Sequence, residues 1–338
     1  MKNKKLIWQL PFLIFLVIGT VYIISNQKDV AFQDNKGRVF GTFYQIKYQS
    51  SKDLHAGIIE QLDKVDRSLS IFNKQSVISR INNNEEVVPD TMFTKVFESA
   101  MRISEITDGA FDITVAPLVN AWGFGFKEGT TPEKHVIDSL MQIVGYEKVW
   151  LEDGKIKKKY PKTMIDCGGI AKGYSCDVVA DYLRANGIEN FLVNIGGEIV
   201  TSGINDKRVP WKIQVTKPVE DNMSTESELQ ALINVTDKAM ATSGNYRNFY
   251  YKGGKKYAHT IDPSTGYCVQ HNILSATVLA DRCVDADAYA TAFMVMGLEK
   301  AKIILEKHPE IMAYLICDGK DGNYDVWCSP SLKDKIQE

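Results

Sequence analysis

The sequence predicts an α+β fold in which mixed or antiparallel sheets pack against helices. Two observations predict it: stretches with the apolar pattern of strands are numerous, and the helical stretches do not alternate with them regularly. The chain has 338 residues, of which 44% are hydrophobic and 24% charged, so it can bury a substantial core. Its formal net charge of -2 argues against a nucleic-acid partner, which would need a clustered basic face.

The N-terminus carries a membrane signal. Three lysines lie within the first five residues, and a mostly apolar run extends from Leu6 to Ile24. At about 19 residues this run is long enough to cross a bilayer. The cationic flank should stay in the cytoplasm, which places the rest of the chain on the other side of the membrane. We therefore expect residues 1–24 to be an uncleaved signal anchor, with a cleaved signal peptide as the alternative.

The folded domain is expected to span 39–338, because residues 25–38 are mostly polar and suggest a short tether. A first strand is predicted at 38–49, where apolar and polar residues alternate. A helix should follow, since apolar residues recur at spacings of three and four: Leu54, Ile58, Leu62, Val65 and Leu69. A second helix is predicted at 91–107 and should stop at Asp108-Gly109.

The central part of the chain predicts a strand at 163–166, a glycine-bearing turn, a helix at 174–187 and a strand at 190–200 interrupted by Gly196-Gly197. Further strands are expected at 211–216, 229–236, 255–261 and 274–280, followed by two helices and a closing hairpin. The six cysteines include Cys317 and Cys328, which flank this hairpin and could face each other. Buried free thiols are the interpretation we favour, because no pair has CxxC spacing.

The stretch "IDCGGIAKGYSCD" combines glycines with the start of a predicted helix. Glycines allow a close approach of the backbone to a ligand, and a helix N-terminus offers N–H groups to an anion. Lys172 would lie in the first turn, where a cation is mildly unfavourable unless an anion is near. A tight structural turn with a surface lysine explains the same residues.

The stretch "CVDADAYATAF" places Asp287 and Thr291 four residues apart, so that on a helix they share a face. A carboxylate, a hydroxyl and one or two carbonyl groups form an oxygen set that suits Mg²⁺ completed by phosphate and water. Asp285 could instead cap the helix. For this stretch taken alone, capping and surface roles for all three side chains are the interpretation we favour.

His259 precedes an Asp-Pro-Ser-Thr-Gly turn in "KYAHTIDPSTGY". On a strand at 255–261 it would project near the turn, on the side of whatever binds there. A neutral imidazole could then take a proton from an attacking hydroxyl. The alternative is a structural histidine bonded to the backbone.

Eight segments of the chain match one known pattern when taken in order: "FGTFYQI", "SIFNKQSVISRIN", "GAFDITVAPLVNAWGFG", "IDCGGIAKGYSCD", "LVNIGGEI", "ATSGNYRNFY", "YAHTIDPSTGY" and "DADAYATAFMVMG". Together and in this order they resemble the ApbE-type FAD:protein FMN transferases. The resemblance implies an ApbE-like (T-fold-like) architecture and Mg²⁺-dependent transfer of FMN from FAD to a threonine hydroxyl, with release of AMP. It implies an acceptor flavoprotein, such as a subunit of a respiratory electron-transport complex, and a place on the bacterial inner membrane facing the periplasm or the outside.

The resemblance also implies roles for individual residues. FAD contacts are expected at Phe40, Phe72, Asn120, Ala121, Trp122, Asp166, Lys172 and Ile261. The metal is expected at Asp287, Thr291 and the carbonyl of Gly169, and His259 matches the general base. The chain departs from the family pattern at Asn245, where Asp is usual, at Cys167, where an apolar residue is common, and at Phe40, where Met is common.

Two other functions remain open from the sequence. The same residues would serve a Mg²⁺-dependent FAD pyrophosphatase, in which water replaces threonine and free FMN is released. An anchored flavin-binding protein without turnover would use the FAD contacts alone.

Overall fold

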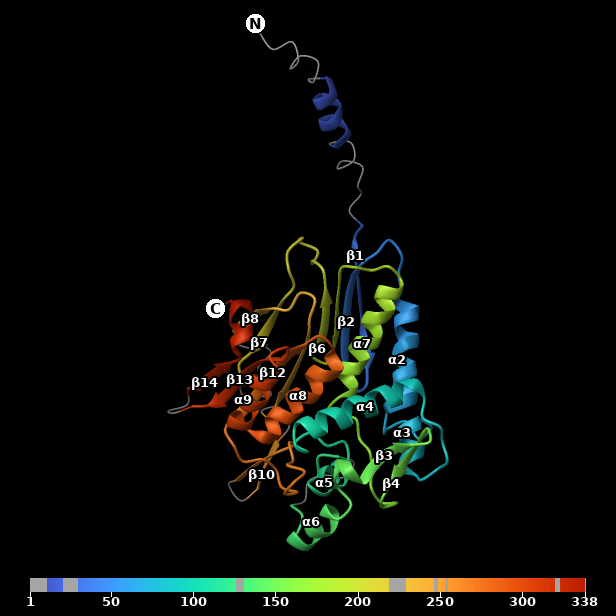
Figure 1. Ribbon diagram of the computed structural model, residues 1–338, viewed down its shortest axis with the longest axis vertical. Helices are drawn as coiled ribbons and strands as arrows, with labels where there is room; N and C mark the ends of the chain where they lie inside the picture. The colour runs from blue at the N-terminus through green and yellow to red at the C-terminus, as the bar shows by residue number, and fades with distance from the viewer. Residues whose placement is uncertain are drawn as a thin grey trace.

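An eight-stranded sheet forms the centre of the computed structural model, which describes residues 11–20, 30–125, 131–218, 229–245, 249–252, 255–319 and 323–337 (Figure 1). The strand order is β1-β2-β5-β6-β9-β12-β13-β14, and every neighbouring pair is antiparallel. The strands are β1 Phe32–Val39, β2 Thr42–Gln49, β5 Phe191–Ile195, β6 Glu198–Ser202, β9 Ala239–Gly244, β12 Ile273–Ala280, β13 Met312–Asp318 and β14 Tyr324–Cys328.

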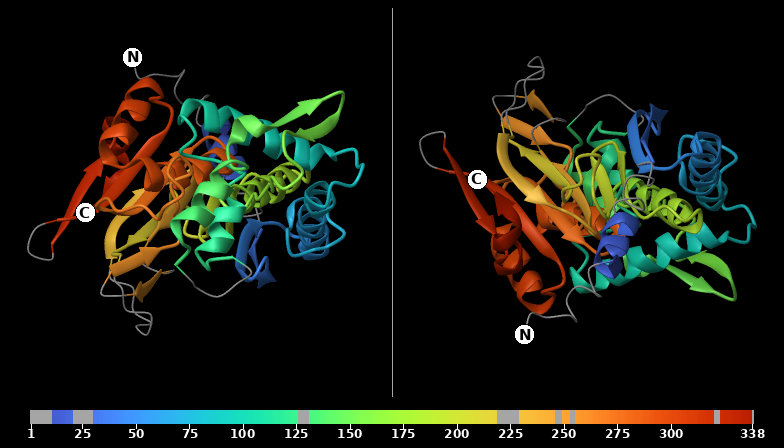
Figure 2. Two further views of the ribbon diagram at one scale, coloured as in Figure 1. Left: turned by 90° about the horizontal axis from the view of Figure 1, so that it is seen from below. Right: turned by 90° about the horizontal axis from the view of Figure 1, so that it is seen from above.

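The two faces of this sheet are covered differently. Since side chains alternate along a strand, Ala276 and Val278 of β12 pack on the helical side, whereas Leu279 packs on the opposite side. The helices on that side are α2 His55–Leu69, α4 Thr91–Ile106, α7 Ala171–Ala185, α8 Cys283–Met296 and α9 Leu298–Lys307. Of these, α2 lies beside α7 (Figure 2). The opposite side carries a small sheet, β15-β8-β7, made of β7 Lys212–Thr216, β8 Leu229–Asn234 and β15 Ile336–Gln337.

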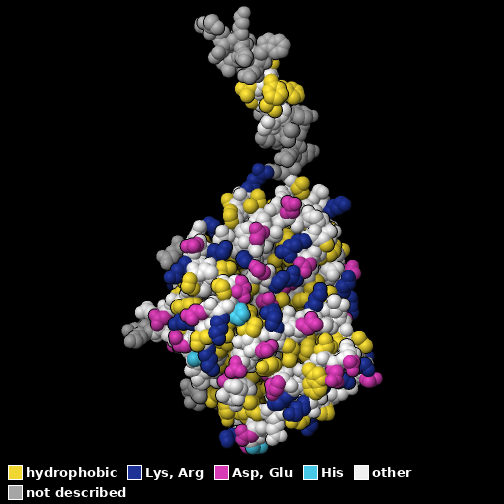
Figure 3. Space-filling model, in the orientation of Figure 1, with side chains coloured by type: hydrophobic (Ala, Val, Ile, Leu, Met, Phe, Trp, Pro, Cys, Tyr) yellow, Lys and Arg dark blue, Asp and Glu magenta, His cyan; other side chains and the backbone are white. Residues whose placement is uncertain are grey.

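Smaller elements complete the described fold. They are the helices α3 Val77–Asn82, α5 Ala116–Ala121 and α6 Lys134–Met141, the short 3-10 turns Tyr146–Lys148 and Pro330–Lys335, and two hairpins, β3 Val149–Glu152 with β4 Lys155–Lys158 and β10 Phe249–Lys252 with β11 Lys255–Ala258. On the face of the molecule seen in Figure 3, basic and acidic side chains are interspersed, so opposite charges neutralise one another locally.

The helices predicted from apolar spacing are confirmed. The residues predicted to face inward on α2 are buried from Ile58 to Leu69, and α4 ends one residue before the predicted position. α7 begins at Ala171, earlier than predicted, and Gly187 just past its end has a φ of 75°. That left-handed conformation is what a glycine stop provides.

The prediction of a tether at 25–38 is wrong for its second half, because Phe32–Val39 forms the edge strand β1. Its sequence, FQDNKGRV, is rich in residues that are uncommon in strands, so local propensity does not reveal it. The strand forms because it pairs with β2 along its whole length, through a turn in which Phe40 and Gly41 both have positive φ. The single strand predicted at 38–49 is therefore a hairpin.

Residues 163–166 are not a strand, contrary to the prediction. The side-chain amide of Asn82 replaces a neighbouring strand here: its Oδ1 accepts from the N–H of Ile165 at 2.8 Å, and its Nδ2 donates to the Ile165 carbonyl at 2.8 Å. The N–H of Asp166 donates to the carbonyl of Ile113 at 2.7 Å. These bonds satisfy the backbone without a sheet.

Of the two sheet types predicted, mixed or antiparallel, the described strands form the antiparallel one. Residues 190–200 form the β5–β6 hairpin rather than the predicted interrupted strand. Cys317 lies opposite Asp325, and Cys328 lies opposite Tyr314, so these two cysteines do not face each other. All six cysteines are free.

The predicted anchor at 1–24 lies largely outside the described residues. Residues 11–20 are helical. Among the residues that the structure describes, no helix has both the length and the apolar character needed to span a bilayer.

Candidate active site

Two adjoining cavities open beside the start of α7. The larger has a volume of about 730 Å³, and its walls include the glycine turn before α7, the tip of the β5–β6 hairpin, the end of β9, the segment after β11 and one face of α8. The smaller has a volume of about 320 Å³. Asp166, Gly168 and Lys172 line both, so the glycine turn forms their common wall. Both volumes suit a small organic ligand.

A close contact between α7 and α8 fixes the position of Asp287. The carboxylate Oδ2 of Asp287, which is 3% exposed, accepts from the backbone N–H of Gly173 at 2.9 Å. A Cβ at Gly173 would lie 2.2 Å from the carbonyl oxygen of Cys283, so only glycine permits this approach. The carboxylate of Asp177 on α7 accepts from the N–H groups of Cys283 and Val284 at 3.0 and 2.9 Å and thereby caps α8.

Asp285 does not cap α8, contrary to the alternative that the sequence left open. The N-cap residue is Arg282, and Asp285 lies in the first turn, where its Oδ1 pairs with Arg102 Nη2 at 2.5 Å. Burial raises the pKa of the capping carboxyl, Asp177, to about 6, against the opposing charge of Arg282.

The three residues expected to bind metal come together in the larger cavity. Thr291 lies one turn after Asp287 on α8, and its Oγ1 is 3.4 Å from Ser243 Oγ at the end of β9. Gly169 is close to the same hydroxyl, because a Cβ at Gly169 would lie 3.1 Å from Thr291 Oγ1. The described residues contain no cluster of three or more His, Cys, Asp or Glu side chains, so a cation here would depend on hydroxyl and carbonyl oxygens as well.

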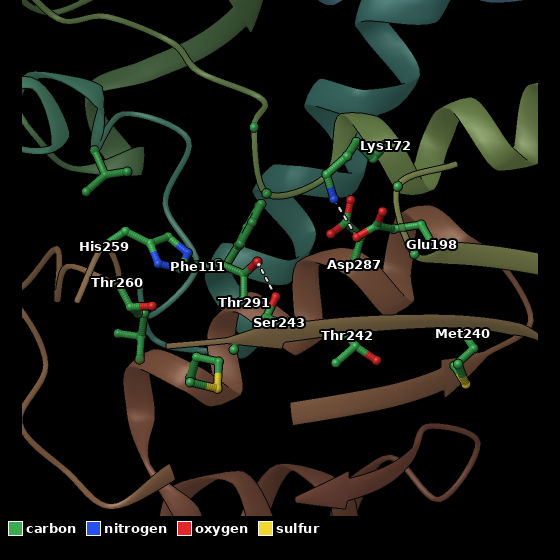
Figure 4. Close-up of a pocket in the computed structure, with 18 of the residues that line it drawn as sticks. Phe111, Lys172, Glu198, Met240, Thr242, Ser243, His259, Thr260, Asp287 and Thr291 are labelled. Atoms are coloured by element: carbon green, nitrogen blue, oxygen red, sulfur yellow. Dashed lines mark hydrogen bonds and ion pairs between the residues drawn. The ribbon is translucent and has the colours of Figure 1, made fainter. Parts of the chain in front are cut away.

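The half-buried ammonium of Lys172 and the buried carboxylates of Glu198 and Asp287 form a charge cluster in the larger cavity (Figure 4). The Nζ atom of Lys172 pairs with Glu198 Oε1. Burial alone lowers the pKa of Lys172, but the negative charges of Asp287 and Glu198 outweigh it and raise that pKa above its ordinary value. Burial, followed by the charge of Asp287, raises the pKa of Glu198 to about 7.

Glu198 is a site residue that sequence reasoning missed. It is the first residue of β6, directly after the Gly196-Gly197 turn. The sequence did contain a signal for it: Glu198 is a carboxylate that follows a glycine pair in a largely apolar stretch. A charged residue is rarely fully buried without a partner, so its position there indicated a buried ion pair or a bound ligand.

His259 directly follows β11, which ends at Ala258, so the strand predicted at 255–261 stops before the histidine. Its position is set by its neighbours: Thr260 Oγ1 donates to Asn245 Oδ1 at 2.5 Å, and Ile261 bridges to Cys268 across the following turn. The half-buried imidazole meets the ring of Phe124 edge-on, with centroids 6.4 Å apart. His259 lines the same cavity as Asp287 and Thr291 (Figure 4).

The predicted FAD contacts divide into two groups. Phe40, Phe72 and Asn120 line the smaller cavity, Ile261 lines the larger one, and Asp166 and Lys172 line both. Phe72 is 78% exposed, so an aromatic surface is available at the cavity mouth. Burial raises the pKa of Asp166, whose Oδ1 accepts from the N–H of Gly168 at 2.8 Å.

Ala121 and Trp122 are not among the described residues that line either cavity. The indole of Trp122 is 3% exposed, donates from Nε1 to the carbonyl of Gly266 at 2.8 Å and stacks on Tyr257 with centroids 5.5 Å apart. Trp122 therefore supports the turn that follows His259.

Comparison with known proteins identifies the family. The ApbE family model matches residues 40–316. A FAD:protein FMN transferase of Vibrio cholerae serotype O1 is 38% identical over 308 residues, which cover 88% of this chain and 90% of that protein. One from Escherichia coli K12 is 33% identical over 312 residues, covering 88% and 87%. The solved structure of the flavin transferase ApbE from Vibrio cholerae aligns with a TM-score of 0.81 and 36% identity, over 90% of this chain and 99% of that one. The chain belongs to the ApbE family.

Proposed function

We propose that this protein is a Mg²⁺-dependent FAD:protein FMN transferase, which moves FMN from FAD to a threonine hydroxyl of an acceptor flavoprotein and releases AMP. The observation that carries the proposal is the single cavity that His259, Asp287, Thr291 and Gly169 line together. Phosphoryl transfer depends mainly on positioning and on neutralising charge, and this cavity has groups for both. Membership of the family and similarity to the named flavin transferases support the reaction class.

The residues present fit a magnesium ion. Asp287 offers a carboxylate, Thr291 a hydroxyl and Gly169 a carbonyl, which are the hard oxygen ligands that Mg²⁺ prefers, and phosphate oxygens and water would complete the shell. Bound there, the cation would neutralise charge on the pyrophosphate as it is cleaved. Even when no cation is bound, the hydrogen bond from the Gly173 N–H holds the Asp287 carboxylate in one orientation.

The other side chains have separate tasks. His259 would accept the proton of the threonine hydroxyl as its oxygen attacks the phosphorus next to the flavin. Phe40, Phe72 and Asn120 would hold one aromatic end of FAD in the smaller cavity, and Lys172, at the wall between the cavities, would face the phosphates. The Asn245–Thr260 hydrogen bond keeps the histidine segment against β9.

Intact-mass analysis tests the reaction. The protein is incubated with FAD, Mg²⁺ and a candidate acceptor, and the acceptor is weighed and its threonines mapped. We expect an addition of the mass of an FMN residue on one threonine, with one AMP released per transfer. Free FMN and AMP with an unchanged acceptor would show a pyrophosphatase instead, and FAD that is bound but never cleaved would show a flavin-binding protein.

We also propose that residues 1–24 anchor the protein in the bacterial inner membrane with its body facing the periplasm or the outside. The lysines before an apolar run support this orientation. Protease added to spheroplasts should digest the body while a cytoplasmic marker survives. Protection of the body until the membrane is lysed would contradict the orientation.

A further inference from the structure

Glu198 lies deep in the wall of the larger cavity, where the fold gives it one charged partner for its two oxygens. The hairpin turn at Gly196-Gly197 places it at the first position of β6, and it is 2% exposed. Its Oε1 pairs with Lys172 Nζ. Its Oε2 is buried and has no hydrogen-bond partner within the described part of the chain.

The local charges do not balance. Lys172 supplies one positive charge, and it faces two buried carboxylates, those of Glu198 and Asp287 (Figure 4). A buried carboxylate that is not fully paired is costly, so this arrangement favours a ligand that brings positive charge. Because the ammonium of Lys172 is paired with Glu198, one negative charge is left unbalanced. That charge lies next to the side-chain oxygens of Asp287 and Thr291.

A simple ion pair would explain Lys172 and Oε1 alone. It would not explain why the second oxygen is left without a donor while a second carboxylate is buried beside the same ammonium. Elsewhere on this helix pair the chain satisfies a buried carboxylate fully, since Asp177 accepts from two backbone N–H groups.

We propose that Glu198 helps to bind the divalent cation and supplies a second carboxylate to the site, in addition to that of Asp287. This inference rests on the cation site of the proposed function and adds to it a residue from the β5–β6 hairpin. Glu198 then has two neighbours in the bound state, Lys172 and the cation or one of its water molecules, and both of its oxygens are used.

The test is binding of Mn²⁺ to the purified protein without FAD, with free Mn²⁺ measured by electron paramagnetic resonance. Glu198→Gln keeps the shape of the side chain and an oxygen for Lys172 but removes the charge. We expect its Mn²⁺ dissociation constant to rise by about 10–100-fold, the usual cost of losing a residue that supports a metal site. Glu189→Gln, the same change at an exposed position before β5, should leave the constant unchanged.

A second pair of variants separates this proposal from simple neutralisation of Lys172. If Glu198 only balances the lysine, Glu198→Gln should have no effect on Mn²⁺ binding once Lys172→Met has removed the ammonium. If Glu198 acts on the cation, Glu198→Gln should weaken binding in that background as well. Equal affinity of Lys172→Met and the double variant would overturn the inference and leave the proposed reaction intact. A wild-type protein that binds no Mn²⁺ would contradict the cation site itself.

Discussion

Replacement of His259 by alanine is expected to abolish FMN transfer to the acceptor while FAD still binds. The imidazole of His259 lines the larger cavity next to the Asp-Pro-Ser-Thr-Gly turn. The side-chain oxygens of Asp287 and Thr291 on α8 line the same cavity. Without a base, the attacking threonine must lose its proton to water, and general-base catalysis typically contributes a factor of about 10²–10⁴. We expect a loss of this size in the rate of covalent flavin formation.

The measurement follows flavin fluorescence on the acceptor after denaturing gel electrophoresis, with FAD affinity determined separately by titration. His271→Ala is the matched control, because that histidine is half-buried, bonds from its ring to the carbonyl of Val295 at 3.1 Å and is not among the described cavity-lining residues. Transfer at nearly the wild-type rate in His259→Ala, with His271→Ala also active, would contradict the role of His259 as base.

Added imidazole provides a second readout for the same variant. An imidazole molecule that diffuses into the space left by the truncated side chain should restore part of the transfer rate, and the restored rate should rise with pH as imidazole loses its proton. A structural defect in the turn would not respond to a free base in this way.

The residues of α8 and the glycine turn could be predicted because their arrangement is local. Asp287 and Thr291 share a face by helical spacing, and a carboxylate in the middle of a largely apolar helix is unusual in itself. Gly169 and Lys172 lie in the turn and first helical turn of one continuous motif. The structure brings these residues together as expected.

Glu198 and Trp122 show what sequence alone does not determine. The role of Glu198 depends on the β5–β6 hairpin folding against α7. This contact pairs Glu198 with Lys172, which is 26 residues earlier in the sequence. Trp122 follows Asn120 closely in sequence, yet its ring points into the core below Gly266 rather than into a cavity. In both cases the direction of a side chain is decided by tertiary packing, which local spacing does not encode.

Replacing Asp287 by asparagine is expected to weaken Mg²⁺ binding so far that the transfer rate no longer saturates at ordinary Mg²⁺ concentrations. Asparagine keeps an oxygen that can accept from the Gly173 N–H, so the α7–α8 contact should survive, but the carboxylate charge is lost. Loss of a residue that only supports a metal site costs up to about 100-fold in affinity, and loss of a ligand should cost at least as much. We expect the Mg²⁺ concentration for half-maximal transfer to rise by at least about 100-fold.

Folding of the same variant should be unharmed when no cation is present. Removing one of two buried carboxylates that face Lys172 relieves their mutual repulsion, so the melting temperature of Asp287→Asn in a chelator should equal or exceed that of the wild type. Asp285→Asn is the control on the same helix: it removes the partly exposed pair with Arg102 and should alter melting slightly and the Mg²⁺ titration not at all. If Asp287→Asn titrates with Mg²⁺ like the wild type, the cation is held elsewhere. If Mg²⁺ still raises the melting temperature of Asp287→Asn as much as that of the wild type, the same conclusion follows without any measurement of transfer.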